Sequence, residues 1–90
     1  MKRNPDLYNI HKKDRCAVCD GEWPMLDIDH VKTFASGGTD EAYNCMTLCR
    51  FCHIQKGTIG TVSMSKKYPR YHNWLIENGW EFVMGKWLHN

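Results

Sequence analysis

The sequence predicts an α+β domain built from a strand hairpin and helices and stapled by a metal ion. The first observation behind this prediction is size. Ninety residues fill one domain, and 42% hydrophobic with 12% aromatic residues is typical of a chain that folds. The second is hydrophobic periodicity, which alternates in the middle of the chain and becomes helical afterwards. The third is a pair of C-x-x-C motifs, which offer the staple that so small a core needs.

The first half of the chain contains one predicted helix and one predicted strand. In residues 5–13, Leu7 and Ile10 stand at near-helical spacing after Pro5, which predicts a short N-terminal helix. Residues 25–34 alternate apolar and acidic side chains and are rich in β-compatible residues, which predicts a strand.

A loop separates this strand from its partner. Gly37 and Gly38 permit positive φ, and Thr39 and Asp40 follow as turn or cap residues. Residues 46–50 then return as the second strand of a hairpin with a long connection.

A helix is expected directly after this second strand. It starts near Phe51 and runs through His53 and Lys56, with Gly57 and Gly60 as its terminators.

The C-terminal third predicts a second helix and a short β segment. Pro69 suits a first helical position, and Gly79 suits the left-handed position after the helix end. Residues 80–90 are consistent with one bent strand or two very short ones. Four large aromatic residues are expected in the core, at about four to one over a role as a ligand platform. They are Trp74, Trp80, Phe82 and Trp87.

The net charge of +2 is distributed unevenly along the chain. Residues 1–15 carry +3, residues 16–48 carry −5, residues 49–70 carry +5 and residues 71–90 carry −1. Basic flanks around an acidic centre are compatible with solvated surfaces. They also suit a cation site inside a phosphate-binding surface.

The chain contains no apolar run of about 18 residues, and its N-terminus lacks the apolar core of a signal peptide. We therefore expect no membrane association and a cytoplasmic location, which is a host cytoplasm if the gene is phage-borne. In a reducing compartment, paired cysteines hold metal more often than they form disulfides.

Cys16, Cys19, Cys49 and Cys52 form the two C-x-x-C pairs, and their thiolates favour Zn²⁺. Two disulfides or a redox motif are the alternatives, together weighted at about one in ten. Four protein ligands leave no open position, so this zinc is expected to be structural. The odd cysteine, Cys45, is expected to be a small buried residue.

A second constellation lies between and just after the zinc ligands. It comprises the Asp29-His30 dipeptide, Asn44, and His53 directly after the last cysteine. None of these residues is specific by itself, because a lone histidine is usually structural.

Taken together, the segment from Leu26 to Lys56 resembles the HNH nuclease family, with L-D-I-D-H-V, S-G-G-T-D-x-x-x-N and L-C-x-x-C-H-x-x-K in order. The resemblance covers about residues 16–57 of a single 1–90 domain. It implies a ββα-metal fold in a metal-dependent DNA endonuclease. The small size would fit a phage-type enzyme.

The resemblance also implies roles for individual residues. Asp29 and His53 would bind one catalytic divalent ion, such as Mg²⁺, Mn²⁺, Ni²⁺ or Zn²⁺. His30 would be the general base, and Asn44 would hydrogen-bond across the hairpin to position His30 or the loop. Asp27 shares the strand face of Asp29 and ranks second as a support of the metal shell.

Two features depart from the family pattern. Cys45 stands where similar sequences often have an apolar residue, and Thr33 stands where many have proline. Adjacent strand residues also point to opposite faces, although Asp29 and His30 must both face the phosphate. The strand should therefore end or distort at His30.

The basic residues expected to contact nucleic acid are Lys56, Arg50, Lys66 and Lys67. For Lys56, simple surface solvation is an equally weighted alternative.

Two other functions remain open at this point. One is a noncatalytic zinc-ribbon module that binds nucleic acid or a protein through its basic flanks. The other is an accessory subunit whose partner, in a DNA-packaging or restriction assembly, supplies specificity.

Overall fold

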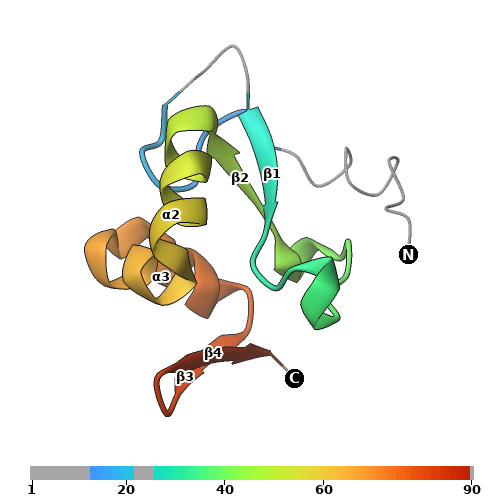
Figure 1. The fold of residues 1–90 in the computed structure, drawn as a ribbon. Coiled ribbons are helices and arrows are strands. Elements are labelled where there is room, and N and C mark those ends of the chain that lie inside the picture. Colours follow the sequence, from blue (N-terminus) through green and yellow to red (C-terminus); the bar gives the residue numbers. More distant parts are fainter. Residues whose placement is uncertain (1–12, 22–25, 90) are drawn as a thin grey trace.

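The computed structural model describes residues 13–21 and 26–89. The central unit is a two-stranded hairpin with one helix lying against it, and a second helix and a small C-terminal hairpin complete the fold (Figure 1). The N-terminal helix predicted over residues 5–13 lies outside the described residues, apart from Lys13. Among the described helices, none combines the length and apolar character needed to cross a membrane.

Strands β1 (Leu26–His30) and β2 (Cys45–Cys49) pair antiparallel, with Leu26 opposite Cys49 and His30 opposite Cys45. The predicted first strand, 25–34, was too long at its C-terminal end, because the chain leaves the sheet after His30 and forms a 3₁₀ turn at Phe34–Ser36. The expectation that the strand ends at His30 is confirmed. The second strand lies one residue earlier than the predicted 46–50.

All five residues of β2 are buried. Helix α2 packs on this hairpin. The segment carrying the first two cysteines is bonded to Thr47 of β2: the Ala17 N–H donates to the Thr47 carbonyl at 2.8 Å, and the Lys13 N–H donates to its hydroxyl at 2.8 Å. These contacts bring the two C-x-x-C motifs to the same end of the hairpin.

Helix α2 runs from Arg50 to Lys67, and Gly60 interrupts it with a positive φ of 85°. Of the two predicted terminators, Gly60 is confirmed as the residue at which the first helical segment ends, whereas Gly57 was wrong. Gly57 lies within the helix, and at Gly60 the chain kinks and resumes. The second half of α2 is retained because it buries Met64 completely in the core.

Helix α3 spans Pro69–Glu77, begins with Pro69 in its first turn and is followed by Gly79 at φ 89°, as predicted. The tail forms two short antiparallel strands, β3 (Trp80–Val83) and β4 (Lys86–His89), which confirms the two-strand alternative.

The core lies between the first hairpin and the two helices. Its fully buried centre contains residues from β2, α2 and α3, namely Met46, Leu48, Met64, Tyr71 and Leu75. Of the four aromatic residues expected there, Trp80 is buried, and Trp74 and Trp87 pack against the core.

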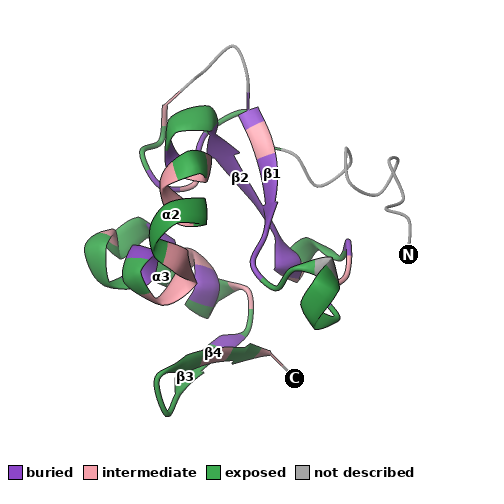
Figure 2. Cartoon of the chain, viewed as in Figure 1, coloured by how far each residue is buried: buried purple, intermediate pink, exposed green. Residues whose placement is uncertain are grey.

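Phe82 is an exception, and its predicted core position was wrong. It is 44% exposed, with its ring 5.2 Å from that of Trp87. Most residues of the C-terminal hairpin are exposed (Figure 2), because a two-stranded ribbon can bury little of its surface.

Candidate active site and metal centres

Four cysteine sulfurs converge where the first hairpin meets helix α2. Every pair of Sγ atoms among Cys16, Cys19, Cys49 and Cys52 lies within 4.8 Å, and Cys19 and Cys49 are 4.0 Å apart. In a tetrahedral site with Zn–S bonds of roughly 2.3 Å, sulfurs stand roughly 3.8 Å apart, so this donor set could hold zinc with small adjustments.

Burial and mutual proximity make deprotonation of these thiols costly unless a cation is bound. Burial raises the pKa of the Cys49 thiol, and burial with the neighbouring Cys49 and Cys16 thiols raises the pKa of Cys52. Thiolates gathered this closely repel one another, and a bound cation removes that penalty by holding them deprotonated. The predicted clustering of the two C-x-x-C pairs is therefore what the structure shows.

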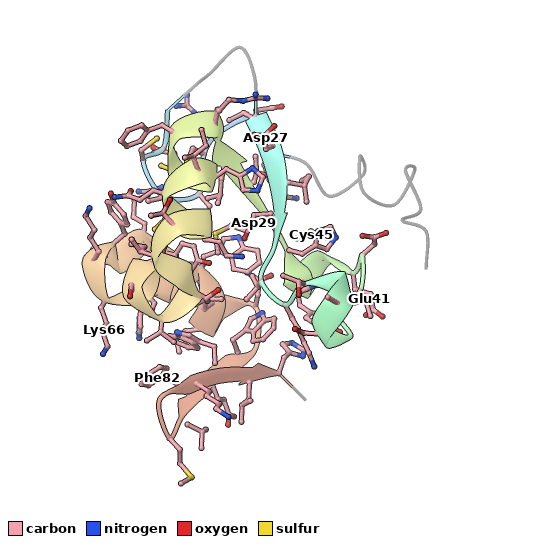
Figure 3. All side chains as sticks on the ribbon, viewed as in Figure 1. Asp27, Asp29, Glu41, Cys45, Lys66 and Phe82 are labelled. Atoms are coloured by element: carbon pink, nitrogen blue, oxygen red, sulfur yellow. The ribbon has the colours of Figure 1, made fainter. Side chains whose placement is uncertain are left out.

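A second cluster lies between β1 and α2, where His53 sits between two carboxylates. Its Nε2 is 3.4 Å from Asp29 Oδ1, and its Nδ1 is 3.2 Å from Asp27 Oδ2. Asp27 and Asp29 are two residues apart on β1 and therefore share the face that α2 covers (Figure 3). A carboxylate bonded to one imidazole nitrogen orients the other, a common arrangement around metal-binding histidines.

Lys56 reaches into this cluster from the next turn of α2. Its Nζ lies 3.2 Å from Asp29 Oδ2 and donates to the His30 carbonyl at 3.2 Å. The Lys56 side chain is 11% exposed, so the ammonium is not a solvated surface charge. Burial raises the pKa of Asp29, and the neighbouring Lys56, His53 and His30 offset part of that shift.

His30 is the last residue of β1. Its Nε2 is 2.6 Å from Asp40 Oδ1, and Cys45 stands opposite it in the strand register. At the end of the strand, Asp29 contacts α2 and His30 contacts the loop between the strands. His30, Asp40 and Cys45 are all buried, with Cys45 4% exposed, as expected for that residue.

Asn44 connects the two ends of this loop. Its Oδ1 accepts from the Lys32 N–H at 2.7 Å, and its Nδ2 donates to the carbonyls of Lys32 and Thr39 at 2.9 and 2.7 Å. A Cβ at Gly38 would stand 1.8 Å from the Lys32 carbonyl oxygen, so only glycine fits there. Asn44 thus holds the segment carrying Asp40 against the end of β1.

A cleft of about 870 Å³ opens beside these residues, between the loop after β1, the middle of α2 and the C-terminal hairpin. Lysines from all three elements line it, namely Lys32, Lys56 and Lys86. Tyr43 and Trp87 also line it.

Three of the basic residues predicted to contact nucleic acid lie outside this cleft. Arg50 is exposed at the start of α2, 3.7 Å from Asp27. Lys66 and Lys67 are exposed at the far end of the same helix (Figure 3).

Sequence reasoning treated Asp40 only as a turn residue and did not single out Lys32 or Lys86. The position of Asp40 in the glycine loop, four residues before Asn44, was the available signal for Asp40. An isolated lysine carries no comparable signal, because only the fold brings Lys32 and Lys86 to one cleft.

Residues 16–58 match the family model described as HNH endonuclease. This segment is an HNH domain. Neither curated proteins nor solved structures include a significant match to the chain. The HNH segment contains both cysteine pairs, the β1–β2 hairpin and the first turns of α2, and it ends just before the kink at Gly60. The predicted family and the ββα core are therefore confirmed, and the four-cysteine cluster beside this core fits the predicted zinc staple.

Proposed function

We propose that this protein is a metal-dependent endonuclease that hydrolyses phosphodiester bonds in DNA. The observation that supports this most strongly is the approach of His53 Nε2 to Asp29 Oδ1, at 3.4 Å, inside an HNH segment. These two donors come from different elements, and the residue next to Asp29 is a histidine able to act as a base.

Asp29 and His53 would hold the catalytic divalent ion. A carboxylate and an imidazole together suit Mg²⁺, Mn²⁺, Ni²⁺ or Zn²⁺. When bound there, such an ion would neutralise charge on the phosphate and on the leaving oxygen. Asp27 accepts from His53 Nδ1 and so directs Nε2 toward Asp29, which is a positioning role.

His30 would take the proton from the attacking water. In a neutral imidazole one nitrogen donates and the other accepts. Because Nε2 is committed to Asp40 at 2.6 Å, the proton acceptor would be Nδ1. Asp40 would then fix the tautomer, and Asn44 would hold the loop that carries it.

The substrate surface would be the lysine-lined cleft. HNH family membership implies a nucleic-acid substrate, and Lys32 and Lys86, which line the cleft, would contact phosphates beside the Asp29 cluster. Tyr43 and Trp87 offer ring faces or edges for sugars and bases. Arg50, Lys66 and Lys67 would add contacts along a longer duplex.

The proposal is tested with supercoiled plasmid incubated with the zinc-loaded protein in Mg²⁺ or Mn²⁺, with parallel samples in EDTA. We expect relaxed or linear plasmid in the metal samples and none in EDTA. DNA binding of equal strength in all samples, with no cleavage under any of these metals, would instead establish a noncatalytic binding module.

A further inference from the structure

The open end of the hairpin contains a second group of soft and borderline metal donors, in addition to the Asp29–His53 pair. A ring nitrogen of His30, a carboxylate oxygen of Asp40 and Cys45 Sγ all lie within 4.8 Å of one another. All three residues are buried, at 6%, 9% and 4% exposure. We propose that His30, Asp40 and Cys45 form a regulatory site for a thiophilic divalent cation of the Zn²⁺ class.

The backbone fixes these three donors in place. His30 and Cys45 are cross-strand partners at the open end of the hairpin, so their side chains project from the same face. Asp40 is held between them by the loop that Asn44 bonds to Lys32 and Thr39. Donors held before the ion arrives bind it with little ordering cost.

Only small movements would bring the three donor atoms to the spacing of a tetrahedral metal site. Bonds of roughly 2.0 Å to nitrogen and oxygen and 2.3 Å to sulfur place tetrahedral donor atoms roughly 3.3–3.5 Å apart. The His30–Asp40 separation of 2.6 Å would open slightly, and the sulfur would close from a distance of up to 4.8 Å. The Cys45 thiol would release its proton to solvent as the sulfur–metal bond forms.

Cys45 also gives the site an approach that does not pass through the lysine-lined cleft. It lines a separate cavity of about 330 Å³ together with Ala42 and Thr47. With three protein ligands, the fourth position would hold water. The thiolate distinguishes this site from the Asp29–His53 pair, because sulfur selects Zn²⁺ over Mg²⁺.

Occupation of this site would stop the reaction, and this consequence depends on the proposed role of His30 as the base. A cation bonded to one ring nitrogen of His30 would hold the imidazole, and the single ring proton would then reside on the other nitrogen, so neither nitrogen could accept a proton from water. The nuclease would then be active in Mg²⁺ and inhibited by low concentrations of Zn²⁺.

The binding test uses protein whose four-cysteine site is filled with one equivalent of Zn²⁺ and which is then titrated with Co²⁺. Thiolate-to-cobalt charge-transfer absorption reports only ions bonded to sulfur, so Co²⁺ bound by Asp29 and His53 does not contribute to it. We expect this absorption in the wild type, its loss in Cys45→Ala and Cys45→Ser, and affinity reduced on the order of 100-fold in Asp40→Asn. The exposed Asp20 pairs with Arg70 at 3.3 Å, and Asp20→Asn should match the wild type.

A wild type without this absorption, or equal absorption in Cys45→Ala, would overturn the site. In the second arm, Zn²⁺ is added to plasmid cleavage in Mg²⁺, where wild type but not Cys45→Ala should be inhibited. Equal inhibition of both proteins would overturn the regulatory role. If neither the wild type nor Cys45→Ala cleaves plasmid, the proposed nuclease function fails. The cobalt titration still decides whether the His30–Asp40–Cys45 site exists.

Discussion

Replacing Asn44 with alanine should be the most damaging single change to the loop that carries Asp40. Asn44 is 1% exposed and makes three hydrogen bonds, at 2.7, 2.7 and 2.9 Å. The substitution leaves the Lys32 N–H and the carbonyls of Lys32 and Thr39 without that partner. Each lost partner costs about 1 kcal/mol where water can replace it and up to about 3 kcal/mol where it cannot.

The expected total is therefore at least about 3 kcal/mol. For a domain of this size, each kcal/mol lowers the melting temperature by about 4–8 °C, so Asn44→Ala should melt roughly 12–24 °C below the wild type. Thermal unfolding followed by far-UV circular dichroism measures this shift. Asn73 is exposed on α3, and Asn73→Ala is the matched control, expected within about 0.5 kcal/mol. A drop of less than about 4 °C for Asn44→Ala would refute this account of the loop.

Three further predictions follow from the metal centre, the core and the site cluster. Cys49→Ser removes a zinc ligand, so this variant should already be unfolded at or near room temperature and show no cooperative melting transition. An unchanged melting curve would contradict this. Burial raises the pKa of Tyr71, so the folded chain keeps a proton that the unfolded chain releases. The free energy of unfolding should therefore decrease as the pH rises above about 10, by up to about 1.4 kcal/mol per pH unit. The decrease should be less steep in Tyr71→Phe, and urea unfolding at several pH values measures both slopes. Lys56→Met should slow plasmid cleavage on the order of 100-fold because Asp29 loses its ammonium partner. The exposed Lys13 lies outside the proposed substrate surface, so Lys13→Met should retain a rate close to wild type.

The sequence was sufficient to predict the elements whose signals are local. The C-x-x-C spacing, the alternation around Ile28 and the Pro69 and Gly79 boundaries of α3 all correspond to observed structure. Each depends on a few neighbouring residues, and the physical rule behind each acts within one element.

The errors arose where tertiary packing decided the outcome. Gly57 did not end α2, because burial of Met64 favours continuation of the helix beyond the kink at Gly60. Phe82 was placed in the core by its hydrophobicity, but the ribbon that carries it has one exposed face.

The candidate site shows the same difference between features set by local sequence and features set by tertiary packing. The HNH segment and its donors were recognisable from their spacing, and the family match supports that reading. The partnership of His30 with Asp40 could not be predicted, because it depends on the loop path that Asn44 fixes. The lysines of the cleft come from three separate elements and meet only in the folded chain.

The most direct test of the central claim is the single-turnover rate of plasmid cleavage by His30→Ala, with the zinc content and melting temperature verified first. The exposed His72, whose ring meets that of Trp87, provides the control His72→Ala. Loss of a general base should slow cleavage by about 10²–10⁴-fold in His30→Ala and leave His72→Ala near the wild-type rate. Cleavage by folded, zinc-loaded His30→Ala at the wild-type rate would contradict the proposed mechanism.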